Sequence, residues 1–505
     1  MPTDPATVSV LLRVAAALDG DREAYVHGER RVDYRWLDRA ADGFAATLLA
    51  AGVRPGEGDR PGDVVCLLLG SSIPFAACYL GALRAGAVTS AVNLRLGPAE
   101  RRSILARTRP AVTVVGPGVT PPDGVDAGLV LDLAAVEDAF GAAPCALPPD
   151  DLDRPACIVW TSGTTGTPKG AVYDQRRMAA ISRNLGELTR PGDRRLVVLP
   201  FAHVGFMTRI WDEVANRTTI VIGAEPWSPQ AHLDALVRED VTMATGVPTQ
   251  WELVLRLDAL DDADLSRLRV CGIGGAPIPP ELVRRMRERL GCPVITRYTS
   301  TEAGVCTSTT SDDPPEVVAT TVGRPAPEVE LRVVGPDNSD VAQGTVGEVW
   351  CRSPAMMRGY WQDPDRTGEA IDPDGWLHTG DLGVLGRDGR LRIVGRTKAM
   401  YLRGGYNVYP AEVEAVLAEH PSVAQVAVCG VPDPVLGELG VAFVVPEPGT
   451  EPSLEDLRAF CRRRLADYKA PDRLVTLEAL PLTAMHKVDT AALVRMVEGR
   501  ASMRP

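Results

Sequence analysis

Residues 161–170 have the sequence TSGTTGTPKG, and this stretch decides the fold that we predict for the chain. The apolar run ACIVWTSG (156–163) leads into it and is typical of a buried strand. A glycine-rich loop after a strand can direct several backbone N–H groups at one anion, and hydroxyl side chains add further donors. Lys169 supplies a positive charge. The stretch therefore predicts a loop that holds phosphate groups.

Two familiar nucleotide-binding motifs do not fit this sequence. In a Walker loop the lysine directly follows the second glycine, whereas Lys169 follows Pro168 and precedes Gly170. The segment GIGGAP (272–277) has a proline where the dinucleotide-binding motif requires its third glycine. Taken alone, TSGTTGTPKG also fits a solvated surface turn. The assignment of a phosphate loop therefore needs support from other segments of the chain.

Short apolar runs alternate with helical patterns on both sides of the loop, which predicts an α/β fold. A strand over 63–70 precedes a helix over 73–86 that Ser72 can cap. Further strands that run into loops are expected over 111–116, 196–203, 218–223 and 268–275. The region 136–156 lacks periodicity and predicts a surface connection.

The pattern of predicted elements changes towards the C-terminus. From about residue 326, short β segments separated by Gly and Pro predict a small β-rich subdomain. After residue 395, helices over 410–420 and 453–465 combine with two strands. We therefore expect an α/β protein whose large N-terminal domain, residues 1–397, contains two αβ sheet subdomains and the β-rich subdomain. A small α+β C-terminal domain, residues 398–505, follows.

The composition excludes several classes of protein. A net charge of -12 over 505 residues argues against a nucleic-acid partner, because such proteins need a basic face. No apolar run has the length of a membrane span, and no secretory signal is visible. The ten cysteines are scattered and the histidines form no i,i+4 pair, which argues against a disulfide framework or a zinc site. We expect a cytoplasmic protein with reduced thiols.

Six more segments follow the loop in a fixed order: PFAHVGF (200–206), GGAP (274–277), YTSTE (298–302), HTGDLG (378–383), GRTK (395–398) and PLTAMHK (481–487). Together with TSGTTGTPKG, this series resembles the adenylate-forming superfamily, which contains acyl-CoA synthetases, peptide-synthetase adenylation domains and firefly luciferase. The resemblance runs nearly end to end. It implies a C-terminal domain that moves relative to the N-terminal domain.

The resemblance implies a site for ATP and AMP. The phosphate loop would wrap the outer phosphates of ATP through Thr161, Ser162, Gly163, Thr164, Thr165, Gly166 and Lys169. The segment Gly275, Ala276 and Pro277 would flank the adenine. Tyr298 would stack on the adenine, while Asp381 and Arg396 would hold the ribose.

The resemblance also implies the catalytic groups. Lys487 would be the adenylation lysine, Thr301 would touch the α-phosphate, Glu302 would bind Mg²⁺, and His203 would lie beside the acyl group. These roles make chemical sense, because a carboxylate that attacks a phosphate needs a point cation between the two anions. Each residue alone also has an ordinary structural interpretation, such as a surface lysine or a turn aspartate.

The segments GGYNVYPAEVE (404–414) and YKAP (468–471) resemble the acyl-CoA synthetase branch. In that branch the small domain rotates after adenylation, so Lys398 would lie at the hinge. Gly404 and Gly405 would then line the tunnel for coenzyme A. Lys469 would meet a phosphate of CoA, although a solvated helix end explains this lysine equally well.

The acyl pocket implied by the resemblance is mostly apolar. We expect its lining to comprise His203, Val204, Phe206, Met207, Trp211, Ile273, Gly274 and Thr299. This set contains no cation for a second carboxylate. The predicted substrate is therefore a hydrophobic monocarboxylic acid, whether fatty, aromatic or polycyclic.

Four residues depart from the pattern of the superfamily: Arg297, Thr299, Ala399 and His486. Because they cluster around adenylation, one alternative is an enzyme largely restricted to thioesterification of a supplied acyl-AMP. A second alternative is an acyl-AMP ligase that loads a carrier protein, and a third is a binding module without turnover. Whether the chain forms a homodimer is left open.

Overall fold

The structure is a computed structural model, and it describes residues 5–161, 168–397, 399–404, 406–483 and 487–501. Its first sheet has six strands, in the order β6-β5-β3-β4-β7-β8. All neighbours are parallel except β8, which runs antiparallel to β7. The bounds are β3 Val64–Leu68, β4 Val88–Ala91, β5 Val112–Val115, β6 Leu129–Leu131, β7 Pro155–Thr161 and β8 Lys169–Asp174.

The second sheet has nine strands, in the order β15-β14-β13-β12-β11-β9-β10-β1-β2. The strands from β13 to β1 are parallel, and antiparallel strands complete both edges. The bounds are β1 Glu23–His27, β2 Arg30–Asp33, β9 Arg194–Val197, β10 Thr219–Ile222, β11 Met243–Gly246, β12 Val270–Ile273, β13 Val294–Ser300, β14 Gly304–Ser308 and β15 Arg324–Pro325.

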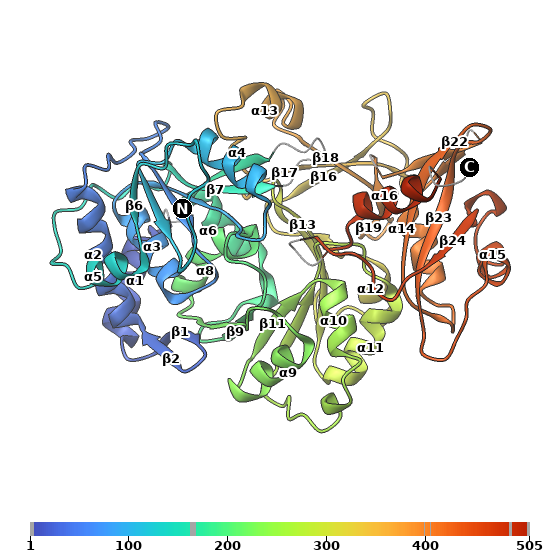
Figure 1. Cartoon of the computed structure of the whole chain (residues 1–505), viewed down its shortest axis with the longest axis horizontal. Coiled ribbons are helices and arrows are strands. Elements are labelled where there is room, and N and C mark those ends of the chain that lie inside the picture. Colours follow the sequence, from blue (N-terminus) through green and yellow to red (C-terminus); the bar gives the residue numbers. More distant parts are fainter. Residues whose placement is uncertain (1–4, 162–167, 398, 405, 484–486, 502–505) are drawn as a thin grey trace.

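Helices cover the faces of these sheets (Figure 1). They are α1 Val8–Asp19, α2 Tyr34–Ala50, α3 Ile73–Arg84, α4 Pro98–Thr108, α5 Leu133–Ala139, α6 Gln175–Asn184, α7 Val204–Met207, α8 Ile210–Ala215, α9 Pro229–Arg238, α10 Pro248–Val254, α11 Pro280–Leu290 and α12 Pro315–Thr320. Helix α3 is buried along its whole length, as its continuous apolar sequence requires. Ser72 caps it by accepting a hydrogen bond from the Phe75 amide at 3.3 Å.

The start of the expected 136–156 connection is helical, which corrects the sequence-based expectation. Helix α5 includes residues 136–139, and Asp132 caps it by accepting from the Ala135 amide at 2.9 Å. Val136 and Ala139 are buried in the core beside α2. A seven-residue helix is too short to show its period in the sequence, so the cap and this packing decide its conformation.

A third sheet of four antiparallel strands follows, with β16 Glu330–Val334, β17 Gly347–Arg352, β18 Leu377–Leu385 and β19 Leu391–Arg396, and with helix α13 Pro364–Ala370. The last sheet contains β20 Tyr401–Arg403, β21 Tyr406–Val408, β22 Val423–Asp433, β23 Gly437–Pro446 and β24 Arg473–Thr476, with helices α14 Pro410–Leu417, α15 Leu454–Arg462 and α16 Thr490–Ala501. Figure 1 shows this last unit at one end of the molecule, while the chain between β24 and α16 reaches back towards β13.

The cysteines and the longest apolar helices can be described from this fold. All ten cysteines are free, and nine of them are buried, so they contribute to packing as small apolar groups. Among the helices in the described part of the chain, none combines the length and the apolar character needed to cross a bilayer.

Candidate active site

The site is built at the carboxyl end of strand β12, where parallel α/β sheets commonly bind ligands. Gly274 and Gly275 follow this strand directly, and Gly275 has a φ of +79°. A Cβ atom added at Gly275 would lie 3.9 Å from both Cε and Nζ of Lys487. The C-terminal unit therefore inserts its lysine at the carboxyl ends of the parallel strands of the nine-stranded sheet.

Lys487 lies among groups of both charges. Burial lowers the pKa of its ammonium, and the Arg396 guanidinium lowers it further, whereas Asp381 and Glu302 act in the opposite direction. These interactions bring three segments predicted from the sequence, around residues 302, 381 and 396, to the same lysine. A cation held in this way can stabilise negative charge that develops beside it.

His203 caps helix α7 and faces the same lysine. Its Nδ1 accepts the Gly205 backbone N–H at 3.1 Å. Burial, and secondarily the charge of Lys487, lower the pKa of His203 to about 3. The imidazole is therefore neutral at pH 7, and the hydrogen bond at Nδ1 leaves Nε2 as the donor. It can donate one hydrogen bond into the site without adding charge.

Asp381 is the centre of a second group of contacts. Its Oδ2 accepts the Tyr298 hydroxyl at 2.5 Å, and its Oδ1 accepts Nε of Arg396 at 2.5 Å. The Asp381 side chain is 8% exposed, whereas that of Arg396 is 60% exposed. Asp381 on β18 thus binds one residue from β13 and one from β19. Because the Arg396 side chain is exposed, a polar ligand can approach the carboxylate from that side.

Tyr360 is a site residue that the sequence interpretation missed. Its hydroxyl donates to Oε1 of Glu302 at 3.0 Å, and Nζ of Lys169 lies 5.0 Å from the centre of its ring. The tyrosine therefore connects the metal-site candidate with the lysine of the phosphate loop. The only sequence signal was the pair Tyr360–Trp361 after Gly359, in a chain with 5% aromatic residues.

Backbone pairing fixes the strand that leaves the phosphate loop. The amide of Trp361 donates to the Gly170 carbonyl at 2.7 Å, and the Arg358 amide donates to that of Val172 at 2.8 Å. Nη1 of Arg107 donates to the Pro168 carbonyl at 3.0 Å. Lys169 and Gly170 consequently have a rigid backbone from which Lys169 can extend.

Several predicted pocket residues lie in the hydrophobic core. Phe206 and Met207 are fully buried, and the Phe206 ring stacks on that of Phe201 with centroids 3.6 Å apart. Ile273 is also buried, in the core beneath the nine-stranded sheet. The prediction that these three residues line the acyl pocket is therefore corrected, because they belong to the core. Val204 and Thr299 are partly exposed at the ends of α7 and β13.

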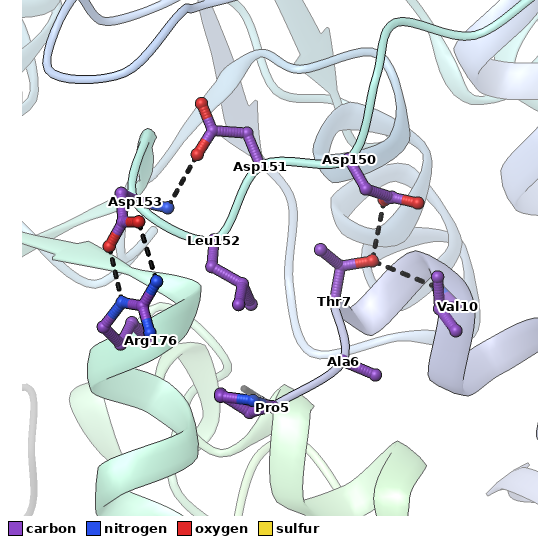
Figure 2. Close-up of a pocket in the computed structure, with 9 residues that line it drawn as sticks. All are labelled: Pro5, Ala6, Thr7, Val10, Asp150, Asp151, Leu152, Asp153 and Arg176. Carbon is purple, nitrogen blue, oxygen red and sulfur yellow. Dashed lines mark hydrogen bonds and ion pairs between the residues drawn. The ribbon is translucent and has the colours of Figure 1, made fainter. Parts of the chain in front are cut away.

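Trp211 points away from the lysine, towards the N-terminal segment. Its indole N–H donates to the Ala6 carbonyl at 2.8 Å. Figure 2 shows that Ala6 lines a shallow hollow between this segment and residues 150–153. The polar groups there bond to one another, as when the Thr7 hydroxyl donates to Asp150 at 2.7 Å, so we assign no function to the hollow.

The remaining predicted residues fall into three places. The backbone carbonyl of Thr301 accepts a hydrogen bond from the Tyr173 hydroxyl at 2.6 Å. Ala276 and Pro277 directly follow Gly275 in the chain. Gly404 is exposed on the C-terminal unit, where Lys469 forms an ion pair with Glu412 at 2.6 Å. The residues Ser162, Gly163, Thr164, Thr165, Gly166, Lys398, Gly405 and His486 lie outside the described residues.

Arg297 departs from the pattern of the superfamily, and the sequence predicts no role for it. It lies on β13, and its Cγ would be 3.6 Å from a Cβ added at Gly274. Strand side chains alternate between faces, so Arg297 shares its face with Thr299, whereas Tyr298 faces Asp381. The structure thus adds an arginine beside Gly274, which the predicted apolar lining did not include.

The site therefore combines a partly buried ammonium, a neutral histidine, a carboxylate that accepts from two donors, and a second carboxylate that Tyr360 connects with Lys169. A family model described as AMP-binding enzyme matches residues 12–361 of the chain. A second model, described as AMP-binding enzyme C-terminal domain, matches residues 412–487.

Individual proteins show the same similarity. A propanoyl:CoA ligase of Rhodococcus jostii, whose acyl group carries a methyl-dioxo-octahydro-indenyl ring system, is 36% identical over 97% of this chain and 98% of its own. Indoleacetate–CoA ligase of Aromatoleum aromaticum is 34% identical, and 94% of each chain is covered. Among solved structures, amide bond synthetase McbA of Marinactinospora thermotolerans is 30% identical with a TM-score of 0.85, covering 97% of this chain and 99% of that chain.

Proposed function

The chain belongs to the AMP-binding enzyme family, and we propose that it is an acyl-CoA synthetase, an ATP-dependent and AMP-forming carboxylate–CoA ligase. The observation that carries this proposal is the insertion of Lys487 beside Gly275, within the electrostatic reach of Asp381, Arg396 and Glu302. This arrangement suits the joining of two anions, the carboxylate of the acid and the α-phosphate of ATP.

In the first half-reaction, a carboxylate oxygen attacks the α-phosphorus of ATP, and pyrophosphate leaves with the electrons of the broken P–O bond. Lys487 lies between the two anions and offsets their repulsion. His203 donates from Nε2 to the acyl carboxylate, Thr301 contacts the α-phosphate, and Lys169 with the phosphate loop holds the departing pyrophosphate. The product is acyl-AMP.

Mg²⁺ fits this site as a companion of the phosphates. Among the described residues, no group of three or more His, Cys, Asp or Glu side chains could hold a metal ion by itself. Mg²⁺ is usually bound by one or two carboxylates together with substrate phosphates and water. Glu302, oriented by the Tyr360 hydroxyl, would be the protein ligand. When bound, the ion supplies charge neutralisation on the phosphates.

In the second half-reaction, the thiolate of CoA attacks the acyl carbonyl and AMP leaves. We assign this step to a rotation of the C-terminal domain, residues 398–505, about a hinge at Lys398. The rotation withdraws Lys487 and brings Gly404 and Gly405 to the site. Gly404 has a φ of +57° and is exposed, which suits close approach to a ligand. The ion pair of Lys469 with Glu412 would open when Lys469 meets a CoA phosphate.

The acceptor is tested by supplying one acid with three alternative nucleophiles: CoA, a holo-carrier protein and a primary amine. An acyl-CoA synthetase forms the CoA thioester fastest. Preferential acylation of the carrier protein or of the amine would assign the chain to a different type of ligase. Pyrophosphate release is measured in parallel, since a chain restricted to thioesterification would use acyl-AMP but release no pyrophosphate from ATP.

The pH dependence of adenylation should reflect Lys487. The lysine acts as a cation, and burial lowers its pKa, so kcat/KM for pyrophosphate release should fall as pH rises through this lowered value, below the ordinary range of a lysine. Above it, the loss should approach roughly tenfold per pH unit for a single proton. The variant Lys487→Arg, which stays charged, should lose this alkaline limb while keeping measurable activity. An identical limb in both proteins would assign the titration to another group.

A further inference from the structure

The side chain of Arg297 is partly exposed, but part of its guanidinium is buried without a partner. Its Nη1 is buried without a hydrogen bond, and no hydrogen bond or ion pair of this side chain occurs within the part of the chain that the structure describes. Buried polar groups normally have a partner, and a buried charge without one is costly. Burial, and then the charges of Arg209 and Arg195, lower the pKa of Arg297 to about 9, against the opposite effect of Asp212.

The neighbouring charges do not neutralise Arg297. Arg195 is satisfied at both ends of its fork, since Nη1 pairs with Glu213 and Nη2 donates to the Gly205 carbonyl at 2.8 Å. Arg209 is 4% exposed and donates Nη2 to Asp212 at 3.0 Å, but its Nε and Nη1 have no partner. Three guanidinium groups thus face two carboxylates, and burial raises the pKa of Glu213 to about 7, which weakens one of them.

This excess of positive charge lies next to residues of the candidate site. Cγ of Arg297 would lie 3.6 Å from a Cβ added at Gly274, and Lys487 adjoins the next residue, Gly275. Arg297 shares a face of β13 with Thr299 and lies about 7 Å further into the sheet, since a strand advances about 3.3 Å per residue. His203 lies next to Gly205, whose carbonyl Arg195 binds. The arginine cluster is therefore linked to the candidate site through Gly205 and Gly274.

We propose that the acyl pocket recognises a second anionic group on the substrate acid, which Arg297 binds directly and which Arg209 supports with its remaining N–H groups. The carboxylate to be activated lies at Lys487, while the second carboxylate, or a group of similar charge, lies at Arg297. This inference rests on the proposed function and specifies its substrate class. It replaces the expectation of a purely hydrophobic monocarboxylic acid with an acid that carries an apolar spacer between two anionic ends.

The test compares acids of equal length in the native protein. Dicarboxylates from malonate to adipate are assayed for CoA thioester formation beside the monocarboxylates with the same number of carbons and the oxo acids that end in a ketone. At the best spacer length, we expect the dicarboxylate to exceed the monocarboxylate in kcat/KM by roughly a hundredfold, because a site built around a charged hydrogen-bond donor rejects analogues that lack the partner. An equal or higher rate with the oxo acid would overturn the assignment of an anion.

The variant Arg297→Met removes the charge and keeps most of the volume. It should lose the preference for the dicarboxylate, through a higher KM for that acid, while the monocarboxylate is used at least as well as before. Its Tm should be unchanged or higher, because the substitution removes a partly buried charge that has no partner. Arg39→Met, on an exposed arginine of α2, is the matched control and should change neither preference nor Tm.

Besides the oxo-acid result, three results would overturn the proposal. They are a native protein without preference for dicarboxylates, an Arg297→Met variant that keeps the preference, and a variant that loses activity on both series together with stability. Failure of the proposed function has a different signature. In that case, no acid of any series gives a CoA thioester with the native protein.

Discussion

Lys487→Ala should lower substrate-dependent pyrophosphate release by roughly two to three orders of magnitude, the usual effect of removing one group that stabilises developing negative charge. The lysine lies beside Gly275 and within reach of the charges of Asp381 and Glu302, so no other described side chain occupies the same position. Thioester formation from chemically prepared acyl-AMP should change by less than about threefold, because the C-terminal domain withdraws this lysine before that step in the proposed cycle.

The two half-reactions must be measured separately for this prediction, one by pyrophosphate release and one by acyl transfer from acyl-AMP to CoA. The matched control is Lys469→Ala, which removes a lysine of the same unit that forms an ion pair with Glu412 instead of facing Gly275. That variant should show the reverse pattern, with normal adenylation and weaker use of CoA. An equal loss of both half-reactions in Lys487→Ala would contradict the role that we assign to this residue.

The motifs allowed much of the site to be predicted from the sequence, because each of its polar residues occurs in a short segment of distinctive composition. Examples are Asp381 in HTGDLG, Tyr298 in YTSTE and Lys487 after PLTAMH. The structure places Tyr298 against Asp381, and the charge of Asp381 acts on Lys487. The alternation of strands and helices likewise predicted the α/β class and the change to β-rich structure after residue 326.

The apolar pocket was harder to predict, because composition does not reveal which face of a short helix is turned to the site. Phe206, Met207 and Trp211 all follow His203 within eight residues, and all have side chains suited to a hydrophobic pocket. The structure packs the first two into the core and directs the third towards Ala6. A helix of four residues, such as α7, has no period that sequence analysis can detect.

Arg297 and Tyr360 show the opposite case, in which the informative relation is between distant segments. Tyr360 contacts Glu302 because residues 358–361 pair with β8. No local sequence pattern predicts that pairing. The pKa of Arg297 is lowered by burial and by the charges of Arg209 and Arg195, which are distant from it in the sequence. A charge that lacks a partner can be recognised only once the neighbours of the residue are known.

Asp381→Asn should impair both half-reactions, unlike Lys487→Ala, because the AMP moiety occupies the site in both. The carboxylate accepts the Tyr298 hydroxyl and Nε of Arg396, each at 2.5 Å, and would hold the ribose beside them. An amide offers only one acceptor oxygen and leaves Arg396 without its countercharge. A charge-assisted hydrogen bond contributes about 2 kcal/mol, which corresponds to a roughly thirtyfold loss in kcat/KM for ATP and a similar loss for acyl-AMP.

The exposure of Arg396 limits the cost of this substitution to folding. Its side chain is 60% exposed, so water can solvate the guanidinium that Asp381→Asn leaves behind, and Tm should fall by only a few degrees. The control Asp340→Asn removes a carboxylate that pairs with Arg332 at 2.7 Å on the surface, and it should leave both half-reactions intact. If Asp381→Asn lowered adenylation alone, Asp381 would act on the phosphate chemistry and not on the nucleotide. If it lowered neither, the ribose would have to be bound elsewhere, and the group formed by Tyr298, Asp381 and Arg396 would be structural.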